Sequence, residues 1–239
     1  MRKKDIRKYQ DTVLRALAGK IDDFYLAGGT ALSLFYFQHR FSVDLDFFTN
    51  RFSQERMEDI ISYLKSSVKK RIQLIGRNPG GKKAAMFVYS IYFTKNNILK
   101  MDFVEDVIGL IKSTKLVEGI RVLSLEDIYL RKLYAVSGAV SIKDAVGRDK
   151  FSGGRMESKD LFDLYYLSNT FMTISKFVKK YGNSLMIEGL VQWFRMYDRM
   201  EMMNGVMMLD TDKEIDYRKI ENHIKAEIDK LIESQVGEI

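Results

Sequence analysis

The sequence contains no cysteine and only two histidines, His39 and His223, among its 239 residues. Without cysteine there are no disulfide bonds, no thiolate zinc sites and no cysteine nucleophile, and two histidines are too few for a histidine-rich metal centre. Any catalytic chemistry must therefore come from carboxylates, lysines, hydroxyl groups and metal ions that bind oxygen.

Long apolar runs are also absent, because no window approaches the ~18 unbroken apolar residues that a membrane span requires. The basic start, Met1–Asp5, leads into an amphipathic pattern and not into the apolar core of a secretory signal. With 46% hydrophobic and 30% charged residues, the composition is typical of a globular protein. We therefore expect a cytoplasmic protein without membrane spans.

The charge is unbalanced toward the positive side, with 39 lysines and arginines against 32 acidic residues and a formal net charge of +7. Basic side chains gain affinity for phosphate backbones by releasing counterions, so a polyanionic partner such as nucleic acid is favoured. Charge alone does not identify the partner, and the motifs must decide.

The N-terminal half alternates between helix and strand patterns. A helical stripe covers residues 11–21, a short buried strand covers 24–27, and Gly28-Gly29 separates this strand from a helix that Thr30 can cap. Further elements follow in the order strand 41–48, helix from Ser53, strand 84–93 and strand 98–104.

After about residue 114 the pattern becomes helical, beginning with the capping sequence Ser124–Asp127. We place a domain boundary there, between an α/β domain of residues 1–115 and a helical domain of residues 116–239, which makes the chain an α+β protein. The segment 137–155 is charged and interrupted by glycines, which predicts a mobile loop or a partly ordered insertion.

Two aspartates in the strand pattern 41–48 suggest a metal site. Because side chains alternate along a strand, Ser42, Asp44 and Asp46 would share one face. Carboxylates placed in this way can ligate magnesium, which prefers oxygen, and would repel each other without a cation.

The preceding Gly28-Gly29 turn suits phosphate binding, because glycine lets backbone N–H groups approach an anion and the helix that follows adds a favourable dipole. Either feature alone is common in tight turns and on solvated strand faces. Their order and spacing together favour a site for magnesium and a nucleoside triphosphate, with Gly28, Gly29 and Thr30 at the phosphates.

The segments Leu26–Leu32 and His39–Phe48 together resemble the first motif of the AbiEii/AbiGii toxin family. These bacterial nucleotidyltransferases belong to the polymerase-beta-like superfamily and typically act as the toxin of a toxin–antitoxin or phage-defence pair. Three further segments extend the resemblance over about residues 20 to 168, namely Met101–Phe103, Ser124–Ala135 and Lys159–Leu164. The resemblance implies a nucleotidyltransferase-like mixed sheet with helices in the N-terminal half, followed by a helical C-terminal half.

The resemblance also implies roles for single residues. Asp44, Asp46 and Asp102 would bind one or two magnesium ions, which orient the triphosphate. Lys132 occupies the place of the essential lysine and would act as a point charge on the phosphates, although a lysine on a helix is ordinarily solvated. Asp160, in the essential acidic position, would either assist the nucleophile or hold Lys132. Asp102 as an ordinary surface carboxylate is the alternative to its metal role.

Three further residues are candidates for contacts with the nucleotide. Arg40 and Ser42 are expected to contact phosphate or sugar, although Arg40 could instead pair with Asp44 to organise the site. Lys159, which begins the fourth motif, is expected to join the nucleotide-binding set.

The implied reaction is attack of an acceptor hydroxyl on the α-phosphorus of a nucleoside triphosphate, with release of pyrophosphate. The resemblance implies RNA as the acceptor, notably the 3′ end of tRNA, and an antitoxin protein as a partner. Transfer of a nucleotide or phosphate to a protein hydroxyl, with Ser42 as one candidate, and a non-catalytic nucleotide- or RNA-binding module are the alternatives. The intact set of three aspartates argues against the binding module.

Overall fold

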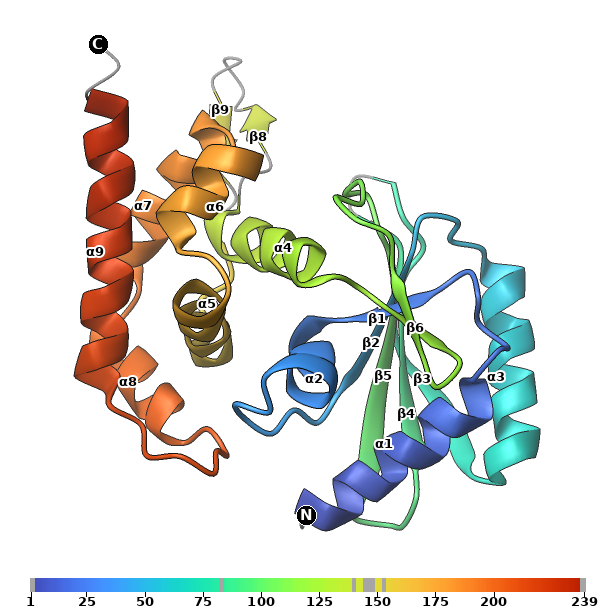
Figure 1. Ribbon diagram of the computed structural model, residues 1–239. Coiled ribbons are helices and arrows are strands. Elements are labelled where there is room, and N and C mark those ends of the chain that lie inside the picture. The colour runs from blue at the N-terminus through green and yellow to red at the C-terminus, as the bar shows by residue number, and fades with distance from the viewer. Residues whose placement is uncertain (1–2, 82–83, 139–140, 144–148, 152–153, 237–239) are drawn as a thin grey trace. The chain divides into compact units, whose positions relative to one another are not determined.

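The protein is described here by a computed structural model that covers residues 3–81, 84–138, 141–143, 149–151 and 154–236. It divides into two compact units, Met1–Asp127 and Ile128–Ile239 (Figure 1). The predicted boundary at residue 115 falls inside the first unit, because the hairpin of β6 (Lys115–Val117) and β7 (Ile120–Val122) still belongs to its sheet.

The first unit contains a seven-stranded sheet in the order β3-β4-β5-β2-β1-β7-β6. Its other strands are β1 (Tyr25–Ala27), β2 (Leu45–Thr49), β3 (Arg71–Asn78), β4 (Met86–Tyr92) and β5 (Ile98–Glu105). The pairs β2–β5 and β1–β7 are parallel and the remaining pairs are antiparallel. The sheet is therefore mixed, and the predicted α+β class is confirmed.

Helices α1 (Lys3–Leu17) and α3 (Gln54–Val68) lie on one face of this sheet, and α2 (Gly28–Ala31) lies on the other (Figure 1). The chain continues from α2 into a π-helical segment, η1 (Leu32–Tyr36). The predicted start of α3 is confirmed, because the Ser53 side chain accepts a hydrogen bond from the backbone N–H of Arg56 at 3.4 Å.

The alternation of side chains separates the core from the site. Leu45, Phe47, Met101 and Phe103 are fully buried, whereas the intervening Asp46 and Asp102 project from the opposite face. The apolar half of each strand thus anchors β2 and β5 in the core and fixes the positions of the acidic residues.

The strand predicted over residues 41–48 is shorter than expected and begins at Leu45. Ser42 and Asp44 precede it in an extended connection that joins no strand, so they do not share a sheet face with Asp46. Side chains bind this backbone instead: Gln10 Nε2 donates to the Ser42 carbonyl at 2.9 Å, and Thr30 Oγ1 donates to the Asp44 carbonyl. No sequence pattern predicted β3, an edge strand whose register shifts between Leu74 and Gly76.

The second unit is mainly helical. Its elements are the greater part of α4 (Leu125–Ser137), a hairpin of β8 (Ser141–Lys143) and β9 (Asp149–Phe151), then α5 (Ser158–Thr170), α6 (Ile174–Tyr181), α7 (Ser184–Met196), α8 (Arg199–Met207) and α9 (Tyr217–Val236). The start of α4 follows the predicted cap, because Ser124 Oγ accepts from the Asp127 N–H at 3.1 Å. Within the predicted insertion 137–155, residues 139–140, 144–148 and 152–153 lie outside the described residues.

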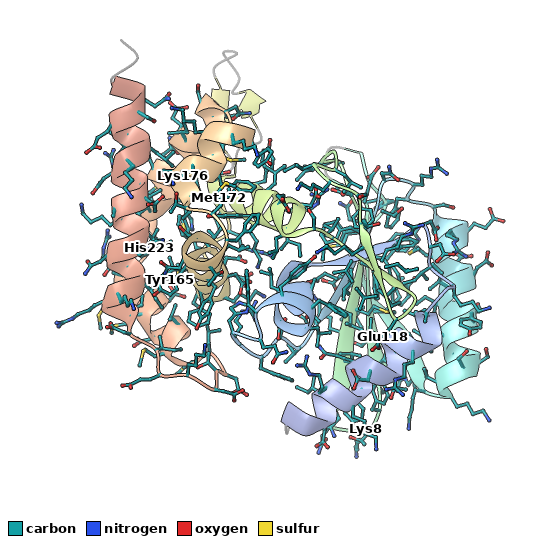
Figure 2. All side chains as sticks on the ribbon, in the orientation of Figure 1. Lys8, Glu118, Tyr165, Met172, Lys176 and His223 are labelled. Carbon is teal, nitrogen blue, oxygen red and sulfur yellow. The ribbon has the colours of Figure 1, made fainter. Side chains whose placement is uncertain are left out.

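Helix α9 closes the second unit by packing on α5, α6 and α7. The rings of Tyr165 on α5 and His223 on α9 meet edge to face, with centroids 5.4 Å apart (Figure 2). Across the described part of the chain, no helix is both long and apolar enough to span a membrane.

Candidate active site

Two aspartates stand next to each other on neighbouring strands. In the parallel pairing of β2 and β5, Asp46 lies directly opposite Asp102, and Asp44 lies two residues before Asp46. Residues opposite each other on one sheet face have Cβ atoms roughly 5 Å apart, close enough for strong interaction between their charges. Asp102 is buried, with 8% of its surface exposed, so it is not the ordinary surface carboxylate that the sequence left open.

Lys100 is the cation of this cluster. It lies two residues before Asp102 on the same face of β5, and its Nζ is 2.6 Å from Asp102 Oδ2. Burial lowers the pKa of Lys100, but the hydrogen bond to Asp102 and the charges of Asp102, Asp44 and Asp46 outweigh it and raise that pKa overall. One ammonium group is therefore stabilised by all three predicted carboxylates. No motif in the sequence marked Lys100 as a site residue, although its two-residue spacing from Asp102 on a strand indicates that both side chains lie on one face.

The donor chemistry of this cluster suits a hard divalent cation, since three carboxylates supply the oxygen ligands that magnesium prefers. Among the residues that the structure describes, however, no three acidic or histidine side chains converge on one point as a metal site. Asp102 instead binds Lys100. The side chains thus fit the ion by chemistry and proximity, in an arrangement in which one lysine offsets part of the negative charge.

The glycine turn before α2 touches the acidic cluster. Gly28 has a φ of +70°, and a Cβ atom at this position would collide with Asp46 Oδ2. Glycine is therefore required both by the backbone conformation and by the approach of the carboxylate. Within the described ranges, no side chain caps the N-terminus of α2.

Arg40 lies behind this turn. It is buried, with 6% of its surface exposed, and a Cβ atom on Gly29 would collide with its Nη2. Its Nη1 donates to the Phe41 carbonyl at 3.2 Å, and its own carbonyl accepts from Ser33 Oγ at 2.7 Å. These contacts make Arg40 a support of the turn from within the protein.

Thr30 and Ser42 connect the turn to the segment that carries Asp44. Thr30 Oγ1 lies 2.8 Å from Ser42 Oγ, at hydrogen-bond distance, and donates its proton to the Asp44 carbonyl. The predicted residues Gly28 to Thr30, Arg40, Ser42, Asp44, Asp46 and Asp102 therefore form one contiguous group in the first unit.

The remaining predicted residues form a separate group in the second unit. Lys132 Nζ lies 2.6 Å from Asp160 Oδ1 and 2.6 Å from Asp163 Oδ2, with the lysine 6% exposed and both aspartates fully buried. Asp160 also receives the guanidinium of Arg155, through Nε at 2.5 Å and Nη2 at 2.9 Å. Lys132 is therefore not a solvated helix lysine, and Asp160 is in a position to hold it.

The sequence analysis missed two members of this second group, Asp163 and Arg155. Asp163 lies three residues after Asp160 on α5, so helical spacing places both on one face, and this was the available signal. Arg155 precedes α5 and no periodic pattern marks it. Lys159 lies outside the group, since its Nζ pairs with Glu157 at 2.9 Å on the surface.

Comparison with known proteins supports the resemblance inferred from the motifs. No curated protein matches the chain in sequence. Two solved structures share the fold: JHP933 from Helicobacter pylori, with 19% identity, coverage of 98% of this chain and 95% of that chain and a TM-score of 0.56, and a structure from H. pylori assigned provisionally as a nucleotidyltransferase, with 20% identity, coverage of 96% of both chains and a TM-score of 0.57. The family profile described as nucleotidyl transferase AbiEii toxin, type IV toxin–antitoxin system, matches residues 12–238. The chain therefore belongs to the AbiEii family of nucleotidyltransferase toxins.

Proposed function

We propose that this nucleotidyltransferase transfers a nucleotide from a nucleoside triphosphate to a hydroxyl of RNA, with the 3′ end of tRNA as the acceptor. The observation that carries the proposal is the direct pairing of Asp46 with Asp102, next to the Gly28-Gly29 turn. This pairing places acidic ligands beside backbone N–H groups, which is the combination that a metal-bound triphosphate needs.

Asp44, Asp46 and Asp102 would hold one or two magnesium ions in this reaction. A bound magnesium ion neutralises phosphate charge and orients the triphosphate for in-line attack. The glycine turn admits the phosphates close to the backbone at the start of α2, and Arg40 keeps that turn in place. The acceptor hydroxyl then loses its proton to solvent as its oxygen bonds to the α-phosphorus, the bond from that phosphorus to the bridging oxygen breaks, and pyrophosphate leaves.

In the second unit we assign the binding of a phosphate by positive charge to Lys132 and Arg155 together. Lys132 is almost fully buried between two carboxylates, whereas 44% of the Arg155 side chain is exposed. A phosphate that approached this group would therefore meet the guanidinium first, while Lys132 and Asp160 would hold it in position. Lys159, with 40% of its side chain exposed, would add a further positive charge nearby in sequence.

The net charge supports RNA as the acceptor, and the family description supports a toxin as the biological role. The net charge of +7 favours a polyanion over a protein hydroxyl. The family description names toxins of type IV toxin–antitoxin systems, so a paired antitoxin is the expected protein partner. Such a toxin would act in the cytoplasm, where tRNA and nucleoside triphosphates are available.

The test is to incubate the purified chain with magnesium, each α-labelled nucleoside triphosphate in turn, and either total RNA or total protein. We expect label in RNA, a preference for particular triphosphates, and loss of labelling when EDTA removes the ion. Label in protein instead would support the protein-hydroxyl alternative, and a folded chain that labels neither would be a binding module.

The matched variants are Asp46→Asn at the site and Asp59→Asn on the exposed surface of α3. Asp46→Asn removes a charged ligand while keeping side-chain volume, so transfer should be abolished with little change in the melting temperature. Asp59→Asn should leave both unchanged. RNA affinity should also fall steeply across a salt series, and a flat response would argue against an RNA acceptor.

A further inference from the structure

We propose that Lys100 is a built-in counter-ion of the acidic cluster, and that a divalent ion binds by displacing Lys100 from Asp102. The proposal rests on the proposed function, because it takes Asp44, Asp46 and Asp102 as the ligands of the ion. It adds a residue that the motifs do not include, and it assigns that residue to the exchange between the metal-free and the metal-bound states.

Lys100 lies on the same face of the sheet as the aspartates. It is two residues from Asp102 on β5, so both side chains point from one face, on which Asp46 stands opposite Asp102. The ammonium is 2.6 Å from Asp102 Oδ2, which is a charge-assisted hydrogen bond of full strength. Lys100 thus occupies one of the oxygen atoms that the ion would need.

Lys100 and a divalent ion cannot bind Asp102 together, because both are positively charged. A divalent ion held by Asp102 would lie roughly 2.1 Å from a carboxylate oxygen, and an ammonium group on the same carboxylate would repel it strongly at that separation. The Asp102–Lys100 pair and a bound ion are therefore alternatives. The negative charges of these carboxylates repel one another, and a nearby cation reduces that repulsion. Lys100 relieves this repulsion until the ion arrives.

Lys100, and not Asp102, is the side chain that moves when the pair breaks. The Asp102 side chain is 12% exposed and belongs to the central strand pair, whereas the Lys100 side chain is 41% exposed on a flexible four-carbon stem. The released ammonium regains water and the incoming ion replaces it on Asp102, so the exchange does not leave the buried carboxylate without a cation. Lys100 therefore swings away while Asp102 stays, and the released ammonium lies beside the phosphates that the ion brings in.

Removal of Lys100 distinguishes this exchange from a supporting role. If Lys100 merely positioned Asp102, its loss would weaken binding of the ion. If it competes with the ion, its loss must tighten binding. We expect Mn²⁺ to bind Lys100→Met about tenfold more tightly than wild type, which corresponds to about 1.4 kcal/mol. Without the ion, Lys100→Met should melt at a lower temperature, and Mn²⁺ should raise its melting temperature more than that of wild type.

The experiment is a calorimetric titration of the whole chain with Mn²⁺ alone. Lys100→Arg retains the positive charge and should bind Mn²⁺ like wild type. Lys70→Met is the matched control, because Lys70 is also an exposed lysine near the sheet but donates to the Phe93 carbonyl at 3.3 Å and contacts no aspartate of the cluster in the bonds described. It should leave Mn²⁺ affinity unchanged.

Failure of the exchange and failure of the proposed function give different results. If Asp46→Asn loses Mn²⁺ but Lys100→Met binds it no more tightly than wild type, the counter-ion role is wrong while the metal site survives. If Asp46→Asn binds Mn²⁺ as wild type does, the ion lies elsewhere, and both the exchange and the proposed metal site are overturned.

Discussion

Replacement of Lys132 by alanine should destabilise the second unit severely. The change removes the ammonium that lies 2.6 Å from both Asp160 and Asp163, and the two aspartates are fully buried. Arg155 still binds Asp160, so Asp163 is the carboxylate that loses its cation in this group. Removing one partner of a buried ion pair costs about 3 to 5 kcal/mol, because the remaining charge stays out of water.

The assay is thermal unfolding followed by circular dichroism. In a chain of this size a loss of 1 kcal/mol lowers the melting temperature by roughly 2 to 4 °C, so Lys132→Ala should melt about 6 to 20 °C below wild type. The control is Lys159→Ala, which breaks a surface pair with Glu157 worth under ~1 kcal/mol and should shift the melting temperature by only a few degrees.

A double variant makes the reasoning sharper. Lys132→Ala combined with Asp163→Ala removes both members of the pair whose atoms lie 2.6 Å apart, and Asp160 keeps its bond to Arg155. The double variant should therefore lose less stability than the two single variants added together, with a coupling of about 1 to 3 kcal/mol. A Lys132→Ala protein that melts within about 2 °C of wild type, or strictly additive losses, would refute the buried ion network.

Two other changes test the turn and the helix packing. Gly28→Ala and Gly19→Ala both force an alanine into the left-handed region, at φ +70° and +66°, but only the first would also collide with Asp46. Both variants should lose roughly 1 kcal/mol of stability in thermal melts. Only Gly28→Ala should lose nucleotide transfer and Mn²⁺ binding. Equal activity in the two variants would show that the contact with Asp46 is unimportant. Burial raises the pKa of Glu227, but its hydrogen bonds from Lys230 and from the side chain and backbone of Ser175 outweigh burial and lower that pKa below the usual 4.5. A lowered folded-state pKa gives stability that is present above about pH 4.5 and is lost as the pH falls through the folded-state value. Glu227→Gln should therefore be less stable than wild type at pH 7 by about 1 to 3 kcal/mol, and its stability should fall less as the pH is lowered. Melting temperatures of wild type and Glu227→Gln that change in parallel between about pH 3 and 7 would contradict this.

Most members of the first group of site residues could be predicted from local patterns because they are close in the chain, whereas Asp102 was proposed only through the family resemblance. Gly28 to Thr30 and Asp44 to Asp46 belong to one strand–turn–helix–strand segment, and local patterns suffice to place them. The strand itself was predicted too long, since alternation begins at Phe41 but pairing begins at Leu45. Alternation shows which face a residue favours and does not show where a partner strand starts.

The contacts that the sequence could not predict join residues far apart. The family resemblance left open whether Asp160 would hold Lys132 or assist the nucleophile, and no helical pattern showed that Asp163 would also bind Lys132. Edge strand β3 escaped for a different reason: most of its residues are exposed, so the apolar alternation that marks a half-buried strand is missing. Burial and pairing across the chain decide both features, and neither leaves a local signature.

Two lysines show why the structure changes the assignment of roles. Lys100 and Lys132 each place an ammonium 2.6 Å from an aspartate, so the distance alone does not separate them. The exposed fraction of the side chain does, at 41% for Lys100 and 6% for Lys132. The Lys100 ammonium can move into water while another cation takes its place on Asp102, whereas Lys132 and both of its aspartates are buried, so breaking those pairs carries the full cost of desolvated charge. A lysine that must take up a new phosphate or yield to a metal ion needs an ammonium that can move into water. A lysine that fixes two helices needs an ammonium that is buried with its partners. Lys100 therefore suits the exchange at the acidic cluster, and Lys132 suits the fixed support of Asp160, which in turn orients Arg155.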